Sequence, residues 1–109
     1  MRSVSAFYLA NNGGFVCFPR IQYIDQNGNK QLTPDTGQRL DINQNSTITV
    51  AQYNIPAGCF GQIYIDIIWG DDRTGGTYFL LDQSANATAM YNITGTTLDS
   101  SVHFNGVST

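Results

Sequence analysis

The stretch that decides the fold is residues 59–69, with the sequence CFGQIYIDIIW. Its odd-numbered positions are all apolar or glycine: Cys59, Gly61, Ile63, Ile65, Ile67 and Trp69. Its even-numbered positions mix large apolar residues with glutamine, tyrosine and aspartate. Because side chains two positions apart share one face of a β-strand, this pattern predicts a strand with one face against the core. A strand of this kind belongs in the middle of a sheet.

The composition of the rest of the chain also favours β-structure. All eight acidic residues are aspartate, and isoleucine, threonine, asparagine, tyrosine and phenylalanine are plentiful, whereas alanine and leucine are few. These residue types fit pleated sheets and turns better than helices. A chain of 109 residues with 41% apolar residues can bury a core and corresponds to a single domain over residues 1–109.

Regular turn signals divide the chain into about nine short strands, which predict an antiparallel β-sandwich, with a small β-barrel as the alternative. The expected strands cover residues 3–10, 15–25, 30–33, 39–42, 46–52, 59–69, 77–82, 87–94 and 101–104. The Asn12-Gly13 and Asn27-Gly28 pairs each predict a hairpin between the flanking strands. In the fourth strand, Leu40 and Ile42 are expected to point inward. Residues 84–90 are rich in alanine and could form one helical turn instead of a strand start.

Charge and motif content exclude several functions. The net charge is −3, and the single lysine and four arginines are scattered, so the chain offers no basic stripe for nucleic acid. Two cysteines and one histidine cannot complete a structural zinc site, and no phosphate loop or dinucleotide motif is present, so we expect no metal and no cofactor. The histidine, His103, alternates with Val102 and Phe104 and should face solvent. Without a catalytic set, the protein is not expected to be an enzyme.

Cys17 and Cys59 each lie in a strand-like run. They could form a buried disulfide, worth about 4 kcal/mol for a loop of this length, or remain two buried thiols. The first residues show no apolar leader, which favours the thiols and a protein that is cytoplasmic or released without a signal peptide, or secreted if the chain has been trimmed. Asp25, Asn27 and Asn29 have the spacing that begins a calcium loop, but the Asn-Gly turn favours a hairpin there.

The loop after the central strand, residues 70–76, carries the best candidate site. Carboxylates and arginine can bind the vicinal hydroxyls of a sugar, and an aromatic ring can pack against its apolar face. The candidate ligand-binding residues are Asp71, Asp72, Arg73, Thr74 and Tyr78, with turn amides from Asn11, Asn12 and Asn54. The competing interpretation is a plain hairpin connection whose acids stabilise turns.

The first functional hypothesis is therefore a carbohydrate-binding protein, a small soluble lectin whose partner is a glycan or glycoconjugate. A homo-oligomer is expected, because multivalency strengthens weak single sites. The alternative is a membrane-binding or pore-forming defence or toxin component that contacts a membrane surface, since Phe60, Tyr64 and Ile68 would form an apolar patch if their side of the sheet were uncovered. A structural assembly subunit is a further alternative.

Trp69 shares its face with Ile63, Ile65 and Ile67, so the alternation predicts that it closes the end of the core. If Trp69 is fully buried, replacing it with alanine should cost about 3–5 kcal/mol of stability. Replacing Asp72 with alanine should leave the fold intact and weaken binding.

Overall fold

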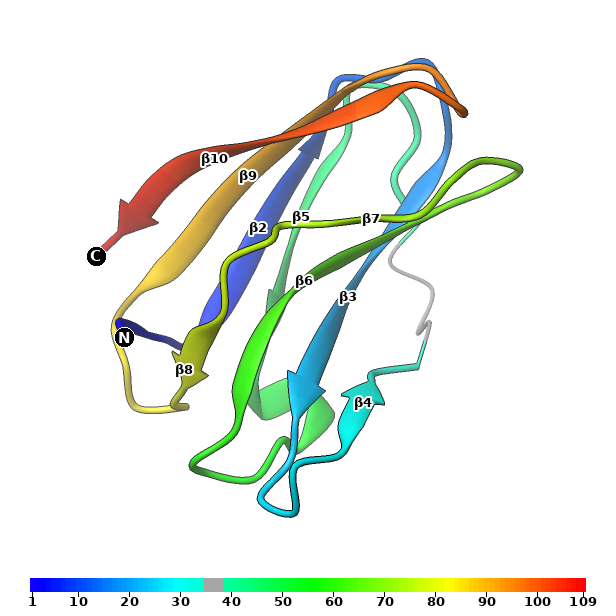
Figure 1. The fold of residues 1–109 in the computed structure, drawn as a ribbon. Coiled ribbons are helices and arrows are strands. Elements are labelled where there is room, and N and C mark those ends of the chain that lie inside the picture. The colour runs from blue at the N-terminus through cyan, green and yellow to red at the C-terminus, as the bar shows by residue number, and fades with distance from the viewer. Residues whose placement is uncertain (35–38) are drawn as a thin grey trace.

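Two β-sheets pack face to face in this protein (Figure 1). The computed structural model describes residues 1–34 and 39–109. The first sheet has the strand order β1-β8-β6-β3-β4, with β7 paired to β6, and consists of β1 (Ser3–Val4), β3 (Cys17–Ile24), β4 (Lys30–Leu32), β6 (Phe60–Ile67), β7 (Arg73–Thr74) and β8 (Phe79–Leu81). The second has the order β10-β9-β2-β5 and consists of β2 (Ala6–Asn11), β5 (Asn45–Thr49), β9 (Thr88–Gly95) and β10 (Ser100–Ser108).

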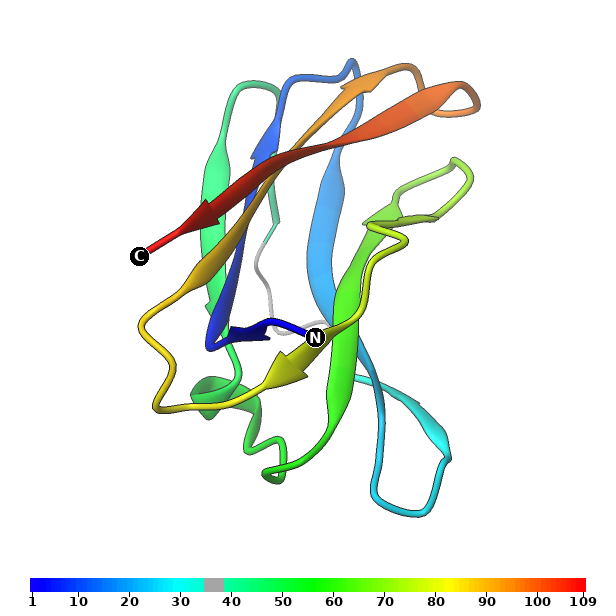
Figure 2. The same ribbon diagram turned by 60° about the vertical axis from the view of Figure 1, so that its left-hand side comes forward.

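This architecture confirms the predicted all-β sandwich, and within the described residues both sheets keep open edges instead of closing into a barrel. The turned view in Figure 2 separates the two layers. The pairing is mixed, which corrects the expectation of a wholly antiparallel fold. β1 pairs in parallel with β8, and β2 pairs in parallel with β9. A short 3-10 turn, η1 (Ala51–Tyr53), follows β5 at the end of the sandwich opposite the β9–β10 turn.

The central position of β6 is also confirmed. It pairs with β3 along its whole length, from Phe60 opposite Ile24 to Ile67 opposite Cys17, and β7 and β8 pair with its other edge. Ile63, Ile65 and Ile67 are each at most 2% exposed. The alternation read from the sequence therefore holds as far as the strand itself extends.

The two sheets are joined through an aromatic contact in the core. The ring of Phe7 on β2 lies 6.1 Å from that of Phe79 on β8 and 6.4 Å from that of Tyr91 on β9. Leu9 and Ile48 of the second sheet are also fully buried. Burial of apolar side chains contributed by both inner faces is what stabilises a sandwich.

The Asn12-Gly13 turn does not form the predicted hairpin. It carries the chain from β2 in one sheet to β3 in the other, because both edges of β2 are already taken by β5 and β9. Asn11 holds this crossover in place: its amide donates to the carbonyl oxygens of Phe15 (2.7 Å) and Leu40 (3.1 Å). The second predicted hairpin, at Asn27-Gly28, is confirmed by the antiparallel pairing of β3 with β4.

Two other local predictions fail. Instead of a strand at residues 39–42, the structure has a single bridge between Leu40 and Cys17, and Ile42 is 56% exposed although Leu40 is buried. The helical-turn alternative for residues 84–90 is wrong as well, since strand β9 begins at Thr88.

The two cysteines are free and buried. Cys17 lies opposite Ile67 and Cys59 immediately precedes Phe60, so they sit at opposite ends of β6, roughly 25 Å apart at the usual rise of a strand. This separation does not permit a disulfide in the folded chain. Burial, with a smaller contribution from the charge of Asp66, raises the pKa of the Cys17 thiol to about 12.

Candidate functional site

One end of the sandwich brings four loops together, and we call this end the tip. It comprises residues 12–16, 39–44, 68–72 and 96–99. Backbone hydrogen bonds join the loops: Ile68 N–H donates to the carbonyl of Val16 (3.0 Å), and Asp71 N–H donates to that of Thr97 (3.1 Å). Asn43 N–H donates to the carbonyl of Asn11 (2.7 Å). The tip is the upper end of the molecule in Figure 1.

Trp69 projects from the tip, which contradicts the prediction that it closes the core. Its side chain is 93% exposed. Strand β6 ends at Ile67, and Gly70 N–H then donates to the Ile67 carbonyl (3.2 Å) in a tight turn. Trp69 occupies the left-handed region of this turn, with a φ of 61°. The turn breaks the two-residue alternation, so the rule that buries the isoleucines does not extend to the tryptophan.

The turn is held against the neighbouring loop by Gly70. A Cβ atom at this position would overlap the carbonyl oxygen of Thr97 and would lie 2.7 Å from a methyl group of Ile67. Glycine is therefore required for the close approach of the two loops, independently of backbone dihedral angles. This packing fixes where the Trp69 turn stands.

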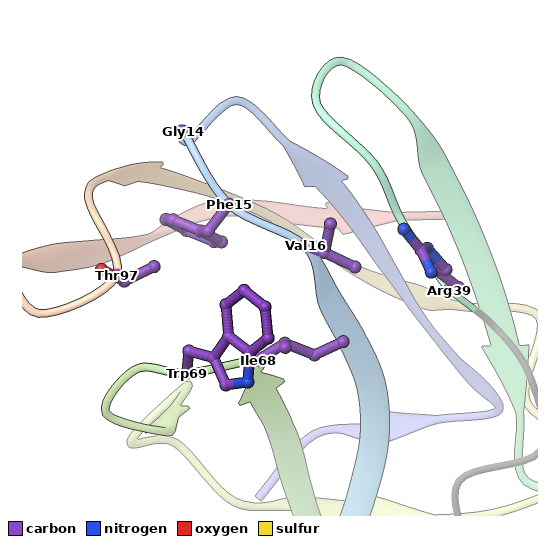
Figure 3. A pocket seen from close by; sticks show the side chains of 7 residues that line it. All are labelled: Gly14, Phe15, Val16, Arg39, Ile68, Trp69 and Thr97. Carbon is purple, nitrogen blue, oxygen red and sulfur yellow. The ribbon is translucent and has the colours of Figure 1, made fainter.

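An apolar pocket of about 470 Å³ opens beside Trp69 (Figure 3). It is lined by Gly14, Phe15, Val16, Arg39, Ile68, Trp69 and Thr97. Figure 3 shows Phe15 on one side and the Trp69 indole on the other, with Ile68 extending from Trp69 towards Arg39. The pocket thus has apolar walls, one cationic side chain and one hydroxyl group.

Other apolar side chains stand exposed in the same loops. Leu98, next to Thr97, is 67% exposed, and Ile42 is 56% exposed. Together with Trp69 they are three of the four large apolar side chains that are more than half exposed in the described part of the chain. Such a concentration at one end of a monomer marks an interaction site more often than chance exposure.

Of the two acidic residues in the predicted site, Asp72 stabilises the turn between β6 and β7. The Asp72 carboxylate accepts hydrogen bonds from the Tyr64 hydroxyl (2.6 Å) and from the backbone N–H of Ile67 (3.0 Å). The hydrogen bond to Asp72 is the main cause that raises the pKa of Tyr64 to about 12, with desolvation second. Asp71 is exposed. The structure therefore gives Asp72 a local structural role.

The other predicted residues of this loop are spread over two faces. Arg73 donates through Nε to the hydroxyl of Ser100 (2.9 Å). Thr74 is exposed on β7, opposite Tyr64. Tyr78 is half-buried on the outer face of the first sheet, where its hydroxyl accepts a hydrogen bond from Gln62 (3.2 Å).

The three asparagines do not gather around this loop. Asn11 is fully buried, and its side-chain amide makes hydrogen bonds with the backbone of Phe15 and Gly13 in the crossover between the sheets. Asn12 is exposed at the tip, and its side-chain oxygen accepts a hydrogen bond from the Asn92 amide (3.3 Å). Asn54 ends η1 at the opposite end of the sandwich. The structure thus brings Asp71 and Asn12 to the tip but separates both from Asn54.

The apolar patch expected from Phe60, Tyr64 and Ile68 is not continuous. Phe60 is 40% exposed at the end of β6 far from the tip, whereas Ile68 belongs to the pocket. Between them lie polar side chains, including the Arg20–Asp66 ion pair (3.3 Å). The prediction that His103 faces solvent is confirmed, and its Nε2 lies 3.0 Å from the Thr94 hydroxyl.

Over residues 1–34 and 39–109, no group of three or more histidine, cysteine or acidic side chains could hold a metal ion. No helix in the same ranges is long and apolar enough to cross a bilayer.

The sequence does not single out Phe15, Val16 or Arg39 as site residues, and it places Ile68 in a patch with Phe60 and Tyr64 instead of in this pocket. The sequence predicts a strand over residues 15–25, but β3 begins only at Cys17. The signal that could have found the site is Trp69 directly before Gly70-Asp71-Asp72, because a turn sequence ends the strand before the tryptophan. No local signal places Arg39 beside them, since that neighbourhood depends on how the sheets pack.

Neither a protein-family model nor a curated protein matches this chain. Among solved structures, it is similar to listeriolysin O, with 18% identity and a TM-score of 0.52, over 96% of this chain and 22% of that chain. It is also similar to a Gram-negative toxin, with 18% identity and a TM-score of 0.51, over 93% of this chain and 22% of the other. A non-haemolytic pneumolysin of Streptococcus pneumoniae strain ST306 has 22% identity and a TM-score of 0.50, over 93% and 23%.

The chain spans less than a quarter of the length of each of these proteins. At such identities the likeness concerns the fold alone. The β-sandwich described above is therefore an arrangement that also occurs as part of larger proteins, one of which is described as a toxin.

Proposed function

We propose that this domain binds the interface of a lipid bilayer through its tip. The observation that carries the proposal is the only tryptophan of the chain, 93% exposed on a left-handed turn beside an apolar pocket. Tryptophan is enriched at membrane–water interfaces, where its apolar ring and polar N–H both find suitable surroundings. The fold shared with part of a Gram-negative toxin supports the same function class.

The expected affinity of one tip is modest. Burying an aliphatic or aromatic side chain is worth about 1.5–3 kcal/mol. Trp69, Leu98 and Ile42 would together contribute about 6 kcal/mol before the cost of immobilisation, which corresponds to a dissociation constant between micromolar and millimolar. A homo-oligomer that presents several tips to one surface would bind far more strongly.

Co-sedimentation with phosphatidylcholine vesicles tests the proposal. Trp69→Ala should reduce the bound fraction several-fold because it removes the largest apolar anchor. The matched control is Phe60→Ala, which removes an exposed aromatic ring from the opposite end of the sandwich and should bind like the wild type. Equal loss in the two variants, or no binding of the wild type, would contradict the proposal.

Release of a dye trapped in the same vesicles separates adhesion from pore formation. A domain that only adheres should leave the vesicles intact at concentrations where it sediments with them. Dye release that depends on Trp69 would extend the proposal to a pore-forming component.

Glycan binding remains a prediction, because the structure does not bring the proposed sugar-binding residues together in one site. Asp72 and Arg73, two of its intended ligands, are engaged within the protein, and the tip leaves mainly Asp71 and Asn12 exposed. A glycan array tests it separately. Binding that Asp71→Asn weakens, and that Trp69→Ala does not change, would favour the glycan over the membrane.

A further inference from the structure

The lining of the tip pocket is mainly apolar, and its charged member is Arg39. Among the described residues that line the pocket, Arg39 alone carries a charged side chain. Its Nε donates to the Asp41 carboxylate at 3.0 Å. This contact leaves the two terminal guanidinium nitrogens without a partner among the described residues. An arginine whose terminal nitrogens face open space is suited to a phosphate oxygen.

The surroundings of the pocket have the opposite sign. Asp41, Asp71 and Asp99 are exposed in or beside the tip loops, and the whole chain has a net charge of −3. Charges within about 8–10 Å of a surface still interact at physiological salt. An anionic bilayer would therefore be repelled by the tip, in spite of Arg39. A headgroup that carries both a phosphate and a cation would meet a complementary group for each charge.

We propose that the tip pocket takes the choline phosphate headgroup of a zwitterionic lipid, with the phosphate at Arg39 and the quaternary ammonium against the Trp69 indole. Quaternary ammonium groups are attracted to the faces of aromatic rings, and the attraction is strongest for tryptophan. The nearby carboxylates add to this attraction. The pocket volume of about 470 Å³ is within the range of small-molecule sites. The inference rests on the proposed membrane function and specifies its lipid.

Figure 3 shows how the two recognition groups are separated. Arg39 and Trp69 stand at different sides of the pocket, with Ile68 between them. Phe15 and Val16 form the opposing wall. A headgroup lying along Ile68 would reach both, and its acyl chains would leave on the side where Trp69 and Leu98 are exposed.

The first experiment compares vesicles of phosphatidylcholine with vesicles in which half of that lipid is replaced by phosphatidylglycerol. The wild-type protein should partition several-fold more strongly to pure phosphatidylcholine. Arg39→Gln should weaken that partitioning about tenfold. Arg2→Gln, which makes the same charge change at an exposed position outside the tip, should leave it unchanged. Stronger binding to the anionic vesicles, or equal effects of the two substitutions, would overturn the inference.

The second experiment uses soluble choline phosphate, followed by Trp69 fluorescence and by NMR shifts of the pocket residues. Choline phosphate should perturb them, whereas inorganic phosphate at the same concentration should act at Arg39 only. Trp69→Leu keeps an apolar side chain without an aromatic face and should weaken choline phosphate binding at least fivefold. Trp69→Phe should retain most of it.

Together, these two experiments distinguish a failure of the proposed membrane function from a failure of the choline phosphate assignment. Vesicle binding with no response to choline phosphate would keep the membrane function and overturn the pocket assignment. A response to choline phosphate with no vesicle binding would show a site for the free compound and overturn the membrane function. Binding of both, with the stated effects of Arg39→Gln and Trp69→Leu, supports the inference.

Discussion

At the scale of single residues, Trp69 is the least expected feature of the molecule. A large side chain is placed in water, and its backbone adopts a left-handed conformation that non-glycine residues enter at a cost of order 1–3 kcal/mol. Neither feature helps folding. Residues that the fold tolerates at such a cost tend to serve binding, and this one borders the pocket.

The first prediction concerns this cost. Trp69→Gly should raise the free energy of unfolding by about 1 kcal/mol, because glycine adopts a φ of 61° freely and no buried contact is lost. Trp69→Ala should change stability little, since the strain remains. Urea denaturation measures both. A loss of 3 kcal/mol or more in either variant would show that the indole is packed against the protein.

A second residue of interest is Tyr91, whose ring is fully buried between the sheets. Its hydroxyl is buried with no hydrogen-bond partner among the described residues. Because an unsatisfied buried polar group is unfavourable by about 1–3 kcal/mol, Tyr91→Phe should stabilise the protein by about 1 kcal/mol. Thermal and urea unfolding check this. A destabilised Tyr91→Phe protein would mean that the hydroxyl is hydrogen-bonded, for instance to an internal water.

At the scale of elements, the turn between β6 and β7 is held by Asp72. Its carboxylate accepts hydrogen bonds from Tyr64 and from the backbone of Ile67. Asp72→Ala should therefore reduce stability by about 1 kcal/mol, a small value because the contact with Tyr64 is exposed and that with Ile67 is only partly buried. This replaces the expectation that the substitution leaves the fold untouched. Asp71→Ala is the control, and an equal effect of both would remove the special role of Asp72.

Alkaline pH probes the same element. The pKa values of Tyr64 and Tyr91 are both raised to about 12, the first mainly by the hydrogen bond to Asp72 and the second by burial. Because the folded pKa values lie above the ordinary value near 10, these two tyrosines leave the free energy of unfolding unchanged below pH 10, and it falls as the pH rises from 10 through 12. Cys17, also raised to about 12, adds to the loss from pH 9 upward.

Between pH 10 and 12, the stability of Tyr64→Phe should therefore fall less steeply with pH than that of the wild type. The stability of the double variant Tyr64→Phe, Tyr91→Phe should fall less steeply still. Urea midpoints measured at intervals from pH 8 to 12 give this slope. A double variant with the same slope as the wild type would contradict the assignment of these tyrosines.

Strands can be predicted from the sequence where the alternation of apolar and polar residues alone determines which side chains are buried. Ile63, Ile65 and Ile67 could be placed in a buried central strand because their neighbours along the chain fix the pattern. Trp69 could not, since a turn of the backbone ended the pattern one residue earlier. The Asn12-Gly13 signal identified a turn correctly but not its partner strands, because sheet pairing is decided by distant segments such as β5 and β9.

At the scale of the whole molecule, the candidate site is a product of packing. Residues from four separate loops form the tip, and the contact between Gly70 and Thr97 shows how closely these loops approach. The sequence contained the chemical groups of the glycan hypothesis within ten positions, yet the fold directs Asp72, Arg73 and Tyr78 into internal hydrogen bonds. Proximity along the chain was a poor guide to proximity in space.

The most direct test of the central claim uses Trp69 as its own reporter, since it is the only tryptophan in the chain. The fluorescence emission of the free protein should be that of an indole in water. On addition of phosphatidylcholine vesicles, the emission should shift to shorter wavelength, and the indole should be protected from the aqueous quencher acrylamide. Unchanged emission and unchanged quenching at a lipid concentration that saturates any binding would contradict the claim that the tip enters a bilayer interface.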